Sequence, residues 1–194
     1  MEEKYKNKYR TSSARLAGWD YGSHGLYFVT ICIKDRIPYF GKIENHNDLK
    51  IQNLETQSSE TQSIASLRFT EIGKIAYDNW ESIPTFHPYV ELDDFIIMPD
   101  HMHGILFINK PDKISWYLNK FGAQSKNLAS ILRGYKSSVK TYATTNDIEF
   151  AWQPRYYDRV IRNDKEYLNI KNYIRDNPDQ WYLNGDNFEN LFNP

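Results

Sequence analysis

The stretch Met98-Pro99-Asp100-His101-Met102-His103-Gly104-Ile105-Leu106-Phe107-Ile108 places two of the five histidines one residue apart, at the head of an apolar run. The Pro-Asp pair before the histidines is typical of a turn. Because side chains alternate along a strand, His101 and His103 are expected to project from one face and Met102 from the other. Paired imidazoles are good ligands for a divalent metal. One histidine could equally be a buried structural residue with an exposed neighbour, so the pair alone leaves its role open.

The composition is that of a globular protein, and 194 residues suffice for one well-buried domain. Cys32, the single cysteine, excludes an internal disulfide framework and fits a reducing cytoplasm. The sequence shows neither a signal peptide nor a membrane span. A formal net charge of −1 argues against a nucleic-acid partner. Between residues 110 and 175, however, 13 Lys and Arg stand against 6 Asp and Glu, which allows either a basic face or an ordinary solvated surface.

Hydrophobic periodicity predicts the elements in order. We expect a strand over 25–33, a helix from Thr70 to Pro84, strands over 87–97 and 101–108, a helix over 127–143, an edge strand within 150–161 and a helix over 164–176. The last helix should stop at Asn177-Pro178, because proline disfavours helical geometry in the residue before it. Residues 1–24 are interpreted as a basic, aromatic arm and residues 44–66 as a polar, mobile insertion.

This order predicts one α+β domain over residues 1–194 with a ferredoxin-like (RRM-like) fold. Its antiparallel sheet should carry helices on one face, and a further C-terminal helix is added to the unit. We expect that added helix to carry a reactive tyrosine, for the reasons given next.

Tyr173 and Asn177 are four residues apart and therefore share one face of the last helix. Asn177 would stand at the helix C-terminus, where unpaired carbonyls favour a nearby cation. Its amide oxygen beside His101 and His103 would give a three-ligand site for Mg²⁺ or Mn²⁺ with positions open for substrate oxygens. Tyr173, one turn earlier, would reach those positions.

A tyrosine beside a metal-bound phosphate can act as a nucleophile, although its hydroxyl has an unperturbed pKa of about 10 and needs activation. Tyr173 could also be one of 15 tyrosines that pack a small core, and Asn177 an ordinary helix stop. The histidine pair and the Tyr-x-x-x-Asn spacing together are more specific than either pattern alone.

With these motifs in place, the sequence resembles the HUH single-tyrosine transposases, and more closely the REP-associated tyrosine transposases. The resemblance runs from Arg10 to Trp181 and is carried by Ser13-Ala14-Arg15-Leu16, Gly18-Trp19-Asp20-Tyr21, Tyr27-Phe28-Val29-Thr30-Ile31, Met98 to His103, Trp152-Gln153-Pro154-Arg155-Tyr156-Tyr157, Ile161-Arg162-Asn163, Tyr173-Ile174 and Asn177-Pro178. The insertion at 44–66 departs from the family pattern. The resemblance implies a metal bound by His101, His103 and Asn177, and a nucleophile, Tyr173, that attacks single-stranded DNA.

In that family the attack leaves a 5′-phosphotyrosine link and a free 3′-hydroxyl, and the substrates are imperfect hairpins of repetitive extragenic DNA. We therefore expect a cytoplasmic, nucleoid-associated endonuclease and strand transferase, as a monomer or a homodimer, without a membrane partner. Basic and aromatic side chains are the candidate DNA contacts, with surface charge and core packing as the alternative: Lys136, Trp152, Arg155, Arg159 and Arg162.

Two other functions fit the same fold. A non-catalytic module that binds hairpin or single-stranded nucleic acid would have lost a ligand or the nucleophile, whereas the sequence retains all four residues. A metal phosphohydrolase that activates water would need more carboxylates near the histidines than Asp100, Asp93 and Asp94.

Overall fold

The computed structural model describes residues 4–5, 8–9, 16, 18–45, 65–113, 115 and 125–184. Residues 46–64 of the predicted insertion, most of the predicted arm and the last ten residues lie outside this part of the chain. The elements follow in the order β1 (Lys4–Tyr5), β2 (Lys8–Tyr9), β3 (Gly25–Cys32), η1 (Lys34–Arg36), β4 (Gly41–Asn45), β5 (Ala65–Phe69), α2 (Glu71–Glu81), α3 (Ile83–Phe86), β6 (Val90–Ile97), β7 (His101–Ile108), α4 (Leu128–Thr145), β8 (Tyr157–Ile161) and α5 (Asp164–Asn184).

The main sheet has four strands in the order β6-β7-β3-β8, and every neighbouring pair is antiparallel. Helix α2 connects β3 to β6, and α4 connects β7 to β8, so each helix crosses over one intervening strand. This is the ferredoxin-like arrangement that the sequence predicts. The strand β8 lies at the edge of the sheet, also as predicted.

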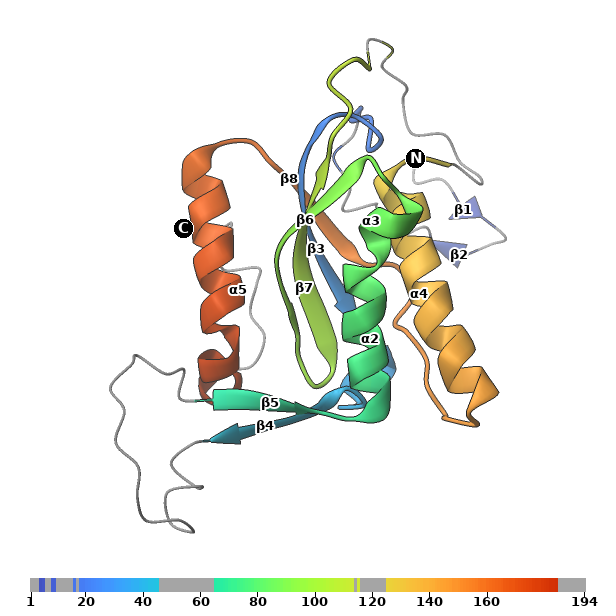
Figure 1. The fold of residues 1–194 in the computed structure, drawn as a ribbon, viewed down its shortest axis with the longest axis vertical. Coiled ribbons are helices and arrows are strands. Elements are labelled where there is room, and N and C mark those ends of the chain that lie inside the picture. Colours follow the sequence, from blue (N-terminus) through green and yellow to red (C-terminus); the bar gives the residue numbers. More distant parts are fainter. Residues whose placement is uncertain are drawn as a thin grey trace.

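Helices cover both faces of the sheet (Figure 1). On one face, alternate residues of β3 and β7 such as Val29 and Met102 pack against α2 and α4, with Trp80 fully buried among them. On the other face, Phe28 and Ile105 pack against Ile170 and Ile174 of α5. The added C-terminal helix therefore covers the opposite face from α2 and α4, and the space between it and the sheet is partly filled by this second apolar cluster.

Two short antiparallel strands, β4 and β5, form a ribbon at one end of the sheet (Figure 1). The sequence assigns residues 44–45 and 65–66 to the polar insertion, but the structure pairs them as the ends of this ribbon. Ile43 of the ribbon packs with Met98, close to Trp181 of α5. Apolar contact thus extends the ordered structure further into the polar segment than composition alone suggests.

Three other boundaries differ from the prediction. Pro84 does not end the long helix but occupies the first turn of α3, where a missing N–H costs nothing. His87 closes α3, so β6 begins at Val90. Only Tyr157 to Ile161 forms the edge strand, while Trp152 makes an isolated bridge to Ile33.

The end of the predicted arm is part of the core. Asp20 and Tyr21 are buried, and the Tyr21 ring packs 6.0 Å from that of Tyr27. The Asp20 carboxylate forms an ion pair with Lys113. Within the predicted arm, β1 and β2 pair only with each other among the described strands.

Helix α5 continues past Asn177-Pro178 to Asn184, so the predicted helix stop is wrong. Proline removes one helical N–H, but Asn177 and Pro178 are both buried against the rest of the protein. Trp181, beyond the proline, packs near Met98 and stacks on His101. These tertiary contacts outweigh the local preference, and they place Asn177 inside the helix rather than at its C-terminus.

Candidate active site

The two histidines of β7 face α5, and Met102 between them faces α2 and α4, as strand alternation predicts. Both imidazoles are fully buried. Their Nε2 atoms lie 3.0 Å apart, and the rings meet edge-on with centroids 4.6 Å apart. Two ring nitrogen atoms thus converge on one point beneath the helix.

Each histidine is oriented through its other ring nitrogen. Nδ1 of His101 donates to Oδ1 of Asp100 at 2.6 Å, and Oδ2 of Asp100 accepts from Nε of Arg36 at 3.0 Å. Nδ1 of His103 shares a hydrogen bond of 2.8 Å with the hydroxyl of Thr30, its direct partner across β3 and β7. Such outer partners fix the ring and leave Nε2 available to a cation.

Arg36 reaches Asp100 from η1, immediately after β3. Asp35 and Arg36 both adopt left-handed backbone conformations, with φ of 56° and 54°, which non-glycine residues rarely do. Nη1 of Arg36 also donates to Sγ of Cys32 at 3.0 Å. The tight turn therefore brings the guanidinium back over the end of the strand and against the buried carboxylate.

Helix α5 supplies the third side of the site. The hydroxyl of Tyr173 lies 3.1 Å from Nε2 of His103, and its ring meets Phe28 edge-on. Two turns later, the indole of Trp181 stacks on His101 with ring centroids 5.8 Å apart. Asn177 lies midway between these residues on the same stripe of the helix and is buried, with 4% of its surface exposed. Asn177 thus shares its stripe of the helix with two residues that contact the histidine pair.

The residues fit a divalent metal in two respects. Adjacent ligands of an octahedral metal at about 2.1 Å are about 3.0 Å apart, which matches the separation of the two Nε2 atoms. In the described parts of the chain, no group of three His, Cys, Asp or Glu side chains gathers at one place. A third protein ligand would accordingly have to be of another type, and the buried amide of Asn177, between Tyr173 and Trp181 on α5, is the candidate.

The five candidate DNA contacts fall into two groups. Nζ of Lys136, on α4, donates to the backbone oxygens of Gln153 and Arg155 at 2.8 and 2.9 Å, and burial lowers its pKa. Nε1 of Trp152 donates to the Lys136 backbone oxygen at 2.9 Å, and the indole packs edge-on against Phe40. Lys136 and Trp152 thus hold the segment before β8, while the Arg155 side chain is exposed.

Arg159 and Arg162 form the second group, at the edge of the sheet beside α5. Arg159 is paired with Phe28 across β3 and β8 and so lies on the face that carries the histidines. Its guanidinium forms an ion pair with Glu166. The backbone N–H of Arg162 donates to the same carboxylate at 3.1 Å, and its side chain is exposed. The structure brings Arg159, but not Lys136 or Trp152, to the histidine face.

Sequence reasoning missed several residues of this site. Asp100 is noted only as a nearby carboxylate, and nothing in the sequence singles out Thr30 or Arg36. Trp181 carries a usable signal, since it follows Tyr173 and Asn177 at a constant spacing of four. That signal is hidden by the assumption that Pro178 ends the helix.

Comparisons with known proteins agree with the resemblance seen in the sequence. No family model matches the chain. An uncharacterised protein of Haemophilus influenzae is 34% identical over 178 residues, covering 87% of this chain and 88% of the relative. The REP-associated tyrosine transposase of Escherichia coli is 25% identical over 88 residues, covering 45% of this chain and 44% of that protein. A solved structure of a REP-associated tyrosine transposase bound to a REP hairpin has 19% identity and a TM-score of 0.53, covering 88% of this chain and 74% of that one.

The ferredoxin-like sheet with a further C-terminal helix is the fold of the HUH transposases. The chain belongs to one family with the Haemophilus influenzae protein. It is similar to the REP-associated tyrosine transposases in sequence over part of its length and in fold over most of it. In the described part of the chain, each helix is too short or too polar to cross a lipid bilayer.

Proposed function

We propose that this protein is a metal-dependent enzyme that nicks and joins single-stranded DNA through Tyr173. The observation that supports this most strongly is the position of the Tyr173 hydroxyl, 3.1 Å from Nε2 of His103 and beside the convergent histidine pair. A nucleophile needs to lie within reach of the phosphate that the site holds.

His101, His103 and Asn177 are the residues that would hold Mg²⁺ or Mn²⁺. When bound, such an ion polarises a phosphate oxygen and favours attack at phosphorus. Asp100 and Thr30 would keep both imidazoles in the tautomer that presents Nε2. The buried position of the pair would keep these ligands away from competing water.

The proposed reaction is a transesterification at one phosphodiester. The phenolic oxygen of Tyr173 forms a bond to phosphorus as the bond to the 3′ oxygen breaks. The phenol gives up its proton, and the leaving 3′ oxygen takes one up as a hydroxyl. The 5′ end stays linked to Tyr173, and attack by the 3′-hydroxyl of another strand reverses the step and joins the two ends.

The proposed substrate is single-stranded DNA that carries a hairpin, such as a repetitive extragenic element. The relative whose fold this chain shares was solved with a REP hairpin. The exposed side chains of Arg155 and Arg162 are best placed for phosphate contacts, whereas Arg159, on the histidine face, is paired with Glu166. Lys136 and Trp152 would act indirectly by holding the Arg155 segment. Such an enzyme would work in the cytoplasm, on the nucleoid.

The proposal is tested by incubating the protein with hairpin oligonucleotides from the repeats that flank its gene, with Mn²⁺ or Mg²⁺. A covalent protein–DNA adduct should form with the wild type and not with Tyr173→Phe. Both proteins should bind the hairpin equally. Equal binding without any adduct in the wild type would instead support the non-catalytic binding module.

A further inference from the structure

The edge strand β6 is irregular at the point where it passes under α5. Its register with β7 shifts between Leu92 and Phe95, so Asp93 and Asp94 together stand opposite the single residue Ile105. Leu92 and Phe95 both pack with the core on the α2 side. In a regular strand, Asp93 and Asp94 would point to opposite faces, whereas a β-bulge lets two successive side chains share one face.

The bulge brings both carboxylates to Lys171 of α5. Nζ of Lys171 lies 2.7 Å from Oδ1 of Asp93 and 3.2 Å from Oδ1 of Asp94. Asp93 also accepts a hydrogen bond from the hydroxyl of Tyr167, one turn earlier on α5, and one from the backbone N–H of Asp94. With two carboxylates against it, the ammonium group of Lys171 is already neutralised and is a poor candidate for a phosphate contact.

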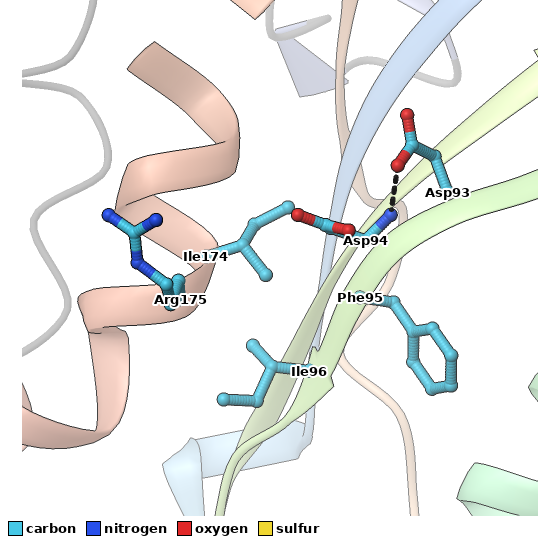
Figure 2. A pocket seen from close by; sticks show the side chains of 6 residues that line it. All are labelled: Asp93, Asp94, Phe95, Ile96, Ile174 and Arg175. Carbon is cyan, nitrogen blue, oxygen red and sulfur yellow. Dashed lines mark hydrogen bonds between the residues drawn. The ribbon is translucent and has the colours of Figure 1, made fainter. Parts of the chain in front are cut away.

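Apolar packing between the helix and the sheet is interrupted at this edge. A pocket of about 400 Å³ opens between β6 and α5, lined by Asp94, Ile96, Ile174 and Arg175 among others. Figure 2 shows the Asp94 carboxylate directed across this space toward Ile174 on the helix. Close packing is what normally holds a helix on a sheet, and a gap of this size removes it locally. The charged contacts of Lys171 therefore supplement the apolar packing of Ile96 against the cluster of Ile170 and Ile174 on this side.

Opposite this clamp, α5 is held at the other edge of the sheet by Glu166, which pairs with Arg159 and accepts from the N–H of Arg162. The two tethers together determine how far the helix is rotated about its axis. Tyr173 follows Lys171 by two residues, so a rotation that the tethers prevent would move its hydroxyl away from His103.

We propose that Asp93, Asp94 and Lys171 form a clamp that positions Tyr173 for attack. These are positioning residues, which touch neither the DNA nor the metal ligands and act through the orientation of α5. The inference rests on the proposed transesterification. In this proposal, the bulge in β6 serves the reaction rather than DNA binding.

The test compares Asp93→Asn, Lys171→Met and Lys171→Arg with the wild type, measuring the rate constant of adduct formation at saturating hairpin and metal. Because a misplacement of about 1 Å costs on the order of a hundredfold, we expect Asp93→Asn and Lys171→Met to slow this step by tenfold to a hundredfold. Lys171→Arg should keep most of the rate. The rate loss of the Asp93→Asn/Lys171→Met double variant should be smaller than the product of the two single losses, since both changes weaken the contact between Asp93 and Lys171.

Binding measurements separate this role from others. Hairpin affinity and Mn²⁺ affinity should stay within about twofold of the wild type. If Lys171 instead contacted phosphate, Lys171→Met would weaken DNA binding, and Asp93→Asn, which removes a negative charge, would strengthen it. Asp112→Asn, in an exposed turn, is the matched control and should change nothing.

A wild-type rate in Asp93→Asn would overturn the clamp, whereas absence of an adduct in the wild type would instead refute the proposed function. Thermal unfolding of each variant checks that the fold persists. Should Asp93→Asn fail to fold, Asp94→Asn tests the same clamp through its longer and more exposed contact, with a smaller loss of rate.

Discussion

The hydroxyl of Tyr173 lies 3.1 Å from Nε2 of His103, although seventy residues separate them along the chain. The same imidazole is held on its other side by Thr30. Three elements, β3, β7 and α5, therefore meet at one ring, and all of them come from one chain. Within a single chain, Tyr173 therefore reaches a histidine of its own sheet.

The histidine pair provides the first prediction. Replacing either His101 or His103 with Ala removes one of two buried nitrogen atoms that face each other, so we expect Mn²⁺ affinity to fall by at least about tenfold. Isothermal titration with MnCl₂ measures this. His87→Ala is the control, because His87 lies between α3 and β6, away from the pair. Unchanged Mn²⁺ binding in both histidine variants would exclude this metal site.

Asp100 provides the second prediction. Asp100→Asn keeps the shape of the side chain but removes the charge that links Arg36 to His101. Loss of such an outer partner typically costs 10–100-fold in metal affinity, and we expect about tenfold here. The same titration detects it, with Asp112→Asn as the matched surface control. An affinity equal to that of the wild type would mean that Asp100 only stabilises the turn.

Two glycines should respond to alanine in opposite directions. A Cβ at Gly104, between His103 and Ile105, would lie 2.5 Å from a ring carbon of the fully buried Trp80. Gly104→Ala should therefore reduce the free energy of unfolding by about 1–3 kcal/mol. Gly134, exposed on α4, has open space around it, so Gly134→Ala should raise the free energy of unfolding by about 0.5–1 kcal/mol. Urea denaturation measures both, and equal signs would contradict the packing described.

The dependence of the free energy of unfolding on pH, below neutral pH, provides the fourth prediction. Burial alone would raise the pKa of Asp93, but hydrogen bonds from Lys171, Tyr167 and the Asp94 N–H lower it overall. A carboxylate with a depressed pKa contributes stability above its unfolded value of about 4 and loses that contribution as the pH falls through its folded value. Lys171 stays charged there, because its pKa is raised chiefly by its hydrogen bond to Asp93.

In urea denaturation from pH 7 to pH 2, Asp93→Asn should accordingly be less stable than the wild type near neutral pH. The difference should shrink below about pH 4, where the wild-type carboxylate also becomes neutral. A difference that stayed constant over the whole range would show that the charge of Asp93 contributes nothing to folding.

The fold follows from the sequence because its signals are local and repeated. Alternation in the stretches around Phe28 and His103 defines the two faces of the sheet, and the helical spacing around Trp80 defines the layer over one of them. The order of these elements then restricts the topology to the ferredoxin-like arrangement that is observed.

The candidate site could be predicted only in part. The histidines, Tyr173 and Asn177 follow from spacing and family resemblance, whereas Thr30 and Arg36 depend on strand register and on a strained turn that sequence does not reveal. Local rules also misplaced the end of α5. These rules include the unfavourable effect of Pro178 on helix formation. They do not include the contacts that Trp181 makes with His101 and Met98.

The most direct test of the account is to locate the DNA on the protein. The adduct formed with a hairpin oligonucleotide and Mn²⁺ is digested with nuclease and protease, and the peptides are sequenced by mass spectrometry. We expect a single modified peptide in which Tyr173 carries a 5′-linked nucleotide. A nucleotide on another residue such as Tyr157 or Tyr167, or a link through a 3′-phosphate, would contradict the central claim.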